Sequence, residues 1–184
     1  MASAALAPPT RIEVERDPRA VARVQVELAE ERPRATAPSP ARVAVQEKRA
    51  SEVLGSVRAG GARPHVLYLY ASYCKACRNV LPSFLELVRA YRARGVRFTA
   101  ASVDQRAAQF EDYAPALGGV LPALWIKPEG PGVTLRELRR AGLNLPEDGF
   151  SIPLFAVFDS AHRLVSQGNT RELPRLPETL DTLL

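Results

Sequence analysis

The stretch HVLYLYASYCKACRNVLPSFLELVRAYRAR, residues 65–94, decides the fold class of the chain. Its first seven residues are almost all apolar, which is typical of a central β-strand covered on both faces. Between Cys74 or Lys75 and Arg94, apolar residues recur at steps of three and four, which predicts a long amphipathic helix closed by Gly95. These apolar positions are Cys77, Val80, Leu81, Phe84, Val88 and Tyr91.

Two cysteines separated by two residues lie where this strand meets the helix, in the motif Cys74-Lys75-Ala76-Cys77. Two intervening residues in a first helical turn bring the sulfurs within reach of a disulfide. Unpaired N–H groups and the helix dipole favour a thiolate at Cys74, by about 0.3–1 kcal/mol at an exposed site. Lys75 adds a positive charge, and the Cys77 thiol can donate a hydrogen bond. We therefore expect Cys74 to be the nucleophile of a thiol–disulfide exchange and Cys77 to resolve it.

The same pair could instead be inert or form half of a metal site. Zinc would need two further ligands, and the only histidines are His65 and His162. His65 precedes the strand, at the end away from the cysteines, and His162 is expected to be a solvated turn residue. The redox interpretation is therefore favoured, with no metal and no cofactor, and a thiolate metal carrier remains a weaker alternative.

The rest of the chain alternates between strand and helix patterns. Thr134-Leu-Arg-Glu137 has the form of a capping box, which predicts a short helix that stops at Gly142. Trp125 is expected in the core. The other predicted strands are Val43–Gln46, Val96–Val103, Ala123–Ile126, Ile152–Phe158 and Leu164–Gln167, and the other predicted helices are Ala50–Ala59, Arg106–Leu117 and 177–184. This order predicts a three-layer α/β sandwich with one parallel and one antiparallel half.

At these residues the sequence resembles the thioredoxin superfamily, especially the TlpA-like thiol–disulfide oxidoreductases. Pro82 lies five residues after the second cysteine, where proline would otherwise disfavour a helix by about 3 kcal/mol. Ile152-Pro153 matches the family's cis-proline, and Gly168 follows the last strand as a glycine does in the family. The resemblance covers residues 42–184. It implies a thioredoxin fold and a substrate chain that lies against Ile152 and Pro153.

The sequence also departs from the family pattern at several positions. Lys75-Ala76 replaces the usual Gly-Pro and Tyr73 replaces the usual tryptophan, so these three residues are expected to modulate the site. Tyr73 either packs or faces the substrate. Tyr68 stands at the position of the buried acid, and Ala100 at that of a common lysine, so an internal proton relay is not expected. The insert before the cis-proline strand, residues 115–148, is longer than in thioredoxin.

Length, composition and charge restrict the class of protein. The chain has 184 residues, is 46% hydrophobic and has no apolar run long enough for a membrane helix, which favours one globular domain without a membrane span. Its net charge is +5, but acidic and basic residues alternate, as in ERDPRA at residues 15–20, so nucleic acid is not an expected partner. We expect a monomer. The sequence as written predicts the cytoplasm, and a processed or truncated chain would be periplasmic.

Residues 1–41 form a separate N-terminal extension, which is expected to be partly flexible. Ile12 and Val14, followed by Val24, Val26 and Leu28, alternate as in a hairpin. Asp17-Pro18 could instead begin a helix. The strand interpretation is slightly favoured.

The function predicted from these observations is exchange of the CxxC disulfide with protein disulfides or dithiols, with a reductase or a dithiol as electron donor. The missing relay residues motivate an alternative, a non-catalytic thioredoxin-like module that binds a partner protein. The direction of the redox reaction follows from potential and compartment, and the motif does not determine it.

Overall fold

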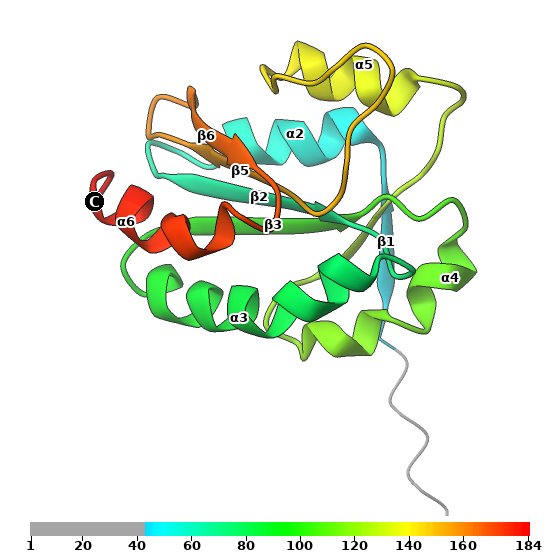
Figure 1. Ribbon diagram of the computed structural model, residues 1–184, viewed down its shortest axis with the longest axis horizontal. Coiled ribbons are helices and arrows are strands. Elements are labelled where there is room, and N and C mark those ends of the chain that lie inside the picture. Colours follow the sequence, from blue (N-terminus) through cyan, green and yellow to red (C-terminus); the bar gives the residue numbers. More distant parts are fainter. Residues whose placement is uncertain (1–42) are drawn as a thin grey trace, which may run out of the picture. The chain divides into compact units, whose positions relative to one another are not determined.

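The computed structural model describes residues 43–184, which form a six-stranded sheet with helices on both faces (Figure 1). The predicted extension over residues 1–41 lies outside the described residues. The strands are β1 (Val45–Lys48), β2 (His65–Tyr70), β3 (Arg97–Ser102), β4 (Ala123–Ile126), β5 (Leu154–Phe158) and β6 (Leu164–Gly168). The helices are α2 (Ala50–Arg58), α3 (Lys75–Arg92), α4 (Ala107–Glu111), α5 (Val133–Arg140) and α6 (Leu176–Asp181), with 3₁₀ helices η1 (Ala114–Leu117) and η2 (Leu173–Arg175).

The sheet has a parallel and an antiparallel half, as the sequence predicted. The strand order is β1-β4-β3-β2-β5-β6. The first four strands in this order pair in parallel, whereas β5 runs antiparallel to β2 and β6 antiparallel to β5. Because β2 is central and both its faces are covered, all six of its residues are buried.

Each face of the sheet packs against its own set of helices and has its own core. Helices α3, α4 and α6 lie on one face, and α2 and α5 on the other (Figure 1). Side chains of β2 alternate between the two faces. The aromatic face contains the buried rings of Tyr68, Tyr70, Phe84, Tyr91, Phe98, Phe110, Trp125 and Phe155. The aliphatic face contains buried Val, Leu, Ile and Ala side chains, with Phe158 as its one fully packed ring among the described residues.

Several local predictions were wrong. The strand predicted over Ile152–Phe158 begins at Leu154, after the cis peptide bond, and the helix predicted over 177–184 spans Leu176–Asp181. The first strand begins at Val45, two residues later than expected. The helix predicted over 106–117 is divided into α4 and η1, because Pro115 has no N–H and cannot continue an α-helix from the preceding turn. The capping box does not form, since α5 begins at Val133 after Gly132. Gly132 is the N-cap residue and has a φ of 69°, a conformation that glycine adopts freely. The helix therefore already includes Thr134, which cannot act as its N-cap.

The insert between α4 and the cis-proline strand contributes both to the sheet and to the helical layers. Its strand β4 lies between β3 and β1, and its helix α5 packs beside α2. Trp125 on β4 is 7% exposed, so its predicted core position is confirmed. Among residues 43–184, no helix is both long and apolar enough to cross a membrane.

Candidate active site

The two cysteines form a disulfide at the beginning of α3. Cys74 is the N-cap residue, and its sulfur accepts a hydrogen bond of 3.1 Å from the Cys77 backbone N–H. The two Cα atoms are 5.2 Å apart. Cys74 is partly exposed, whereas Cys77 is fully buried. The first sulfur can therefore be reached from solvent, and the second lies behind it against the core.

The charge around Cys74 favours an anion there. No acidic residue occupies the first turn of α3, while Lys75 and Arg78 are exposed beside the cysteines. The Cys77 backbone N–H, in the first turn of α3, points toward the Cys74 sulfur.

A loop far away in the sequence approaches the disulfide from the other side. The Ile152–Pro153 peptide bond is cis, as predicted, and it immediately precedes β5. The Cys74 sulfur lies 3.7 Å from the Ile152 carbonyl oxygen. A disulfide sulfur carries no hydrogen, so this is a packing contact in the oxidised protein. Ile152 is partly exposed and Pro153 is buried, which leaves Cys74 opposite the edge of this loop.

The residues expected to modulate the site lie at the surface around Cys74. Tyr73 is 61% exposed, and Lys75 and Ala76 are also exposed. Tyr73 is therefore a surface residue and does not pack into the core. The structure brings together every site residue predicted from the sequence, because β2 and β5 are neighbours in the sheet.

Solved structures with a similar arrangement were found by comparison of the fold. One is a thiol:disulfide interchange protein of the thioredoxin family from Chlorobium tepidum, with 15% identity, a TM-score of 0.54 and coverage of 68% of this chain and 83% of that one. Another is the exposed lipoprotein thioredoxin of Streptococcus pneumoniae, with 21% identity, a TM-score of 0.53 and coverage of 69% and 90%. A secreted disulfide oxidoreductase of Mycobacterium tuberculosis has 14% identity, a TM-score of 0.51 and coverage of 68% and 86%.

The chain has the thioredoxin fold. At these identities the likeness establishes the fold, which confirms the fold predicted from the sequence. No protein-family model matches the chain, and no curated protein matches it.

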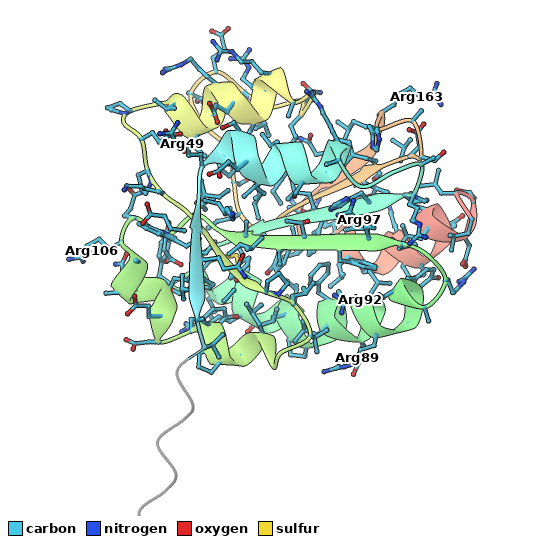
Figure 2. The ribbon with its side chains drawn as sticks, turned by 180° about the vertical axis from the view of Figure 1, so that it is seen from behind. Arg49, Arg89, Arg92, Arg97, Arg106 and Arg163 are labelled. Atoms are coloured by element: carbon cyan, nitrogen blue, oxygen red, sulfur yellow. A yellow bond between two sulfur atoms is a disulfide. The ribbon has the colours of Figure 1, made fainter. Side chains whose placement is uncertain are left out.

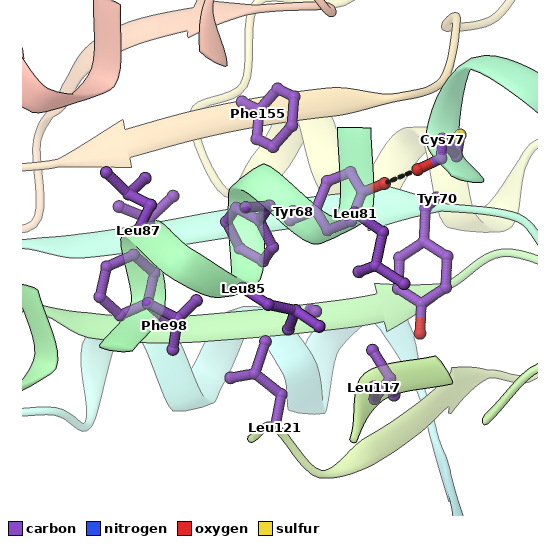
Figure 3. Close-up of a cluster of buried hydrophobic side chains, with 14 of the residues drawn as sticks. Tyr68, Tyr70, Cys77, Leu81, Leu85, Leu87, Phe98, Leu117, Leu121 and Phe155 are labelled. Carbon is purple, nitrogen blue, oxygen red and sulfur yellow. Dashed lines mark hydrogen bonds between the residues drawn. The ribbon is translucent and has the colours of Figure 1, made fainter. Parts of the chain in front are cut away.

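A cluster of aromatic rings lies in the core next to Cys77 (Figure 3). The Tyr68 hydroxyl donates a hydrogen bond of 3.1 Å to the Cys77 carbonyl oxygen. The Tyr68 ring stacks on Phe155 at 4.7 Å and on Tyr70 at 5.0 Å between centroids, and it meets Phe84 at 4.7 Å. Burial raises the pKa of Tyr68 far above its ordinary value, so the hydroxyl stays protonated and acts as a donor.

A buried carboxylate that the sequence interpretation missed holds the segment before the cysteines. Asp104 is fully buried and follows β3. It accepts hydrogen bonds from the Ser72 backbone N–H at 2.9 Å, from the Ser72 hydroxyl at 2.8 Å and from the Ser102 hydroxyl at 2.5 Å. Its own carbonyl oxygen accepts from the Trp125 ring N–H at 2.8 Å. We call this group of four residues the Asp104 clamp. An acid just after a buried parallel strand, at the same sheet edge as the CxxC motif, was the signal that could have revealed it.

The histidines lie away from the cysteines. His65 begins β2, a strand of six residues that is about 20 Å long, while the cysteines follow its other end. Its ring Nε2 shares a hydrogen bond of 2.9 Å with the Thr99 hydroxyl. His162 lies in the turn between β5 and β6 with a φ of 61°. Within residues 43–184, no three His, Cys, Asp or Glu side chains gather as a metal site would require.

The arginine side chains are distributed around the domain. The six labelled in Figure 2 belong to different parts of the fold: Arg49 precedes α2, Arg89 and Arg92 lie on α3, Arg97 begins β3, Arg106 precedes α4 and Arg163 follows β5. Some of the arginines pair with acids, as Arg163 does with Asp159 at 2.7 Å and Arg94 with Asp181 at 2.6 Å. The positive charge of the chain thus comes from several elements.

Proposed function

We propose that this protein is a thiol–disulfide oxidoreductase that exchanges its Cys74–Cys77 disulfide with disulfides or dithiols of other proteins. The observation that carries the proposal is the asymmetry of the pair, with Cys74 open to solvent opposite Ile152 and Cys77 buried behind it. The names of the similar structures, a thiol:disulfide interchange protein, a thioredoxin and a disulfide oxidoreductase, support it.

In the reductase direction the exchange has two steps. The Cys74 thiolate attacks one sulfur of a substrate disulfide, a mixed disulfide forms, and the first substrate thiolate leaves. That thiolate takes the proton of the Cys77 thiol. The Cys77 thiolate then attacks the Cys74 sulfur, and the second substrate thiolate leaves and is protonated by water. The substrate gains two electrons, and the Cys74–Cys77 disulfide is restored. A reductase or a dithiol then reduces it for the next cycle.

The other site residues have positioning roles in this proposal. The extended substrate chain would lie against Ile152 and Pro153, because the Ile152 carbonyl is the group opposite Cys74. Tyr73, Lys75 and Ala76 surround Cys74 at the surface and would modulate its access and charge. Tyr68 stands where related sequences have a buried acid, and its hydroxyl stays protonated. Residue 68 therefore offers no carboxylate that could accept the proton of the Cys77 thiol.

Two matched variants test the proposal. Cys74→Ser should abolish insulin reduction with dithiothreitol as donor, while Cys77→Ser should accumulate a mixed disulfide that mass spectrometry detects. Both variants lose the same disulfide, so a difference between them reports the separate roles of the sulfurs. Normal insulin reduction by Cys74→Ser would refute the proposal.

A second function, binding of a partner protein without turnover, is favoured by the tyrosine at the position of the relay acid. An oxidoreductase turns over many substrate molecules, whereas a binding module does not. Stoichiometric reaction of the reduced protein with insulin, without any multiple turnover under dithiothreitol, would favour the binding module. The reduction potential of the Cys74–Cys77 pair, measured against glutathione, would then show whether the protein reduces or oxidises its partners.

A further inference from the structure

A groove of about 630 Å³ runs beside the disulfide, between the active-site loops and the insert. Tyr73 and Ile152 form its end next to Cys74. Ile126 of β4, Leu135 of α5 and Phe150 before β5 form its apolar walls. The volume lies within the range of about 300–1,000 Å³ in which proteins bind small ligands. The groove is therefore large enough for a few residues of an extended chain.

The groove is continuous with the proposed site of exchange. Tyr73 is adjacent to Cys74 in the sequence, and the Ile152 carbonyl oxygen is 3.7 Å from the Cys74 sulfur. Both residues also line the groove. A polypeptide joined to Cys74 through a mixed disulfide would therefore have the groove directly beside its next residues.

One free carboxylate gives the groove a charge. Asp148 is the single ionisable acid or base lining it besides the hydroxyl of Tyr73, and it is exposed. The neighbouring acids are already paired, Glu147 with Arg139 at 3.7 Å and Glu129 with Arg49 at 3.4 Å. Among residues 43–184, no lysine or arginine nitrogen lies within 4 Å of Asp148. A base lies at the rim of the groove, since Arg136 donates a hydrogen bond of 3.4 Å to the Pro131 carbonyl oxygen, but it makes no ion pair with Asp148. On a chain with a net charge of +5, the unpaired carboxylate of Asp148 attracts a cation.

We propose that the groove binds an extended segment of the substrate protein that flanks the cysteine under attack. Apolar side chains of this segment lie against Leu135 and Phe150, and a lysine or arginine lies beside Asp148. This inference rests on the proposed function, since the segment is held next to Cys74 during exchange. The substrates preferred are therefore protein cysteines with apolar and basic neighbours.

The test uses short peptides whose single cysteine carries a thionitrobenzoate group, so that attack by the reduced protein releases a coloured thiol. One series places an arginine two to six residues from the cysteine on either side, and a matched series places a glutamate there. An extended chain advances about 3.3 Å per residue, so the preference should appear on one side and at few positions.

Four proteins are compared: the full chain, Asp148→Asn, Asp148→Lys, and Glu147→Gln as a control that removes the same charge one residue away. Exposed ion pairs contribute about 0.2–1 kcal/mol, so Asp148→Asn should lower the rate constant of the best arginine peptide by a factor between about 1.4 and about 5. Glu147→Gln should leave it unchanged. Asp148→Lys should reverse the preference toward glutamate, and added salt should reduce the preference of the unaltered chain.

Uncharged 2,2′-dithiodipyridine separates failure of the groove from failure of the proposed function. It should react equally with all four proteins, because it needs Cys74 alone. Equal reaction with dithiodipyridine but no difference between arginine and glutamate peptides would overturn the groove and leave the oxidoreductase standing. The groove proposal would also be wrong if sedimentation showed a dimer that Asp148→Lys dissociates, since a second copy would then be the occupant. If Cys74 reacted neither with the peptides nor with dithiodipyridine, the proposed function itself would be wrong.

Discussion

The two faces of the sheet differ in composition and in what they support. The aromatic face stacks Tyr68, Phe84 and Phe155 directly beneath Cys77 and holds the backbone of that cysteine through a hydroxyl. The aliphatic face has branched side chains under α2 and α5, and its buried polar pair is His65 with Thr99. Large rings with fixed contacts position the Cys74–Cys77 disulfide, whereas the aliphatic layer carries the insert that forms one side of the groove.

This difference indicates that the two faces of the sheet contribute to different properties of the domain. The disulfide lies on the helix of the aromatic face, and the groove walls come from segments attached to the aliphatic face. Changes in the aromatic core should therefore alter the exchange reaction itself. Changes in the aliphatic core should alter stability and the choice of substrate, and should have less effect on exchange with a small disulfide.

The largest effect is expected from a cavity beneath the disulfide. Phe84→Ala removes a fully buried ring that contacts Tyr68, Phe98 and Phe155, and should lower the free energy of unfolding by about 3–5 kcal/mol. It should also slow the reaction with dithiodipyridine, because the support of α3 is lost. Urea unfolding and stopped-flow absorbance measure the two effects.

The matched variant on the aliphatic face is Leu138→Ala, at a fully buried position of α5. It should lower the free energy of unfolding by about 2–5 kcal/mol and leave the rate with dithiodipyridine unchanged in the folded protein. If Leu138→Ala slowed this reaction as much as Phe84→Ala, the two faces would not be functionally separate.

Features that depend on residues close together in the sequence could be predicted, whereas features that depend on distant residues could not. The buried run before Cys74 and the periodic helix after it are local patterns, and both elements were predicted correctly. The cis bond at Pro153 followed from the resemblance alone. The Asp104 clamp joins residues 32 positions apart, and its one signal, an acid just after a buried parallel strand, becomes visible only once the order of the strands is known. The groove likewise depends on how β4 and α5 pack, which periodicity does not specify.

The second effect is a pH dependence located on the aliphatic face. Burial, with smaller contributions from Arg97 and His162, lowers the pKa of His65 from 6.5 to about 4. Because the unfolded chain binds the proton more readily, stability is complete above pH 6.5 and falls as the pH decreases toward 4. The loss at pH 4 amounts to about 3 kcal/mol, from a shift of roughly two and a half pKa units at 1.36 kcal/mol each.

Urea unfolding between pH 4 and 7.5 measures this dependence. His65→Gln should flatten the slope between pH 6.5 and 4, and His162→Gln, which changes the other histidine of the chain, should retain it. Identical slopes for His65→Gln and the unaltered chain would contradict the assignment to the buried ring.

A smaller effect is expected at the carboxyl edge of the sheet, in the Asp104 clamp. Asp104→Asn keeps the shape of the side chain but replaces one acceptor oxygen with an N–H₂ group facing the Ser72 or Ser102 donors. Hydrogen bonds to charged groups contribute about 1.5–3 kcal/mol, so a loss of this size in unfolding free energy is expected. The segment before Cys74 would also loosen, and the rate with dithiodipyridine should fall.

Asp112→Asn is the control for this variant, since it removes the same charge from an exposed residue just after α4. It should change neither stability nor rate by a measurable amount. Equal effects of the two variants would mean that net charge, and not the clamp, determines the result.

The smallest change in stability is expected from removing one of two neighbouring hydroxyls on the aromatic face. Tyr68 and Tyr70 stack on each other in the core, but only the Tyr68 hydroxyl has a hydrogen-bond partner among residues 43–184, the Cys77 carbonyl oxygen. Tyr68→Phe should therefore lower the free energy of unfolding by about 0.5–1.5 kcal/mol. Tyr70→Phe removes a buried hydroxyl that has no partner there, so it should be neutral or stabilising. Urea unfolding of the oxidised proteins measures both effects: a greater loss of unfolding free energy for Tyr70→Phe would show that the hydrogen bond to Cys77 does not stabilise α3.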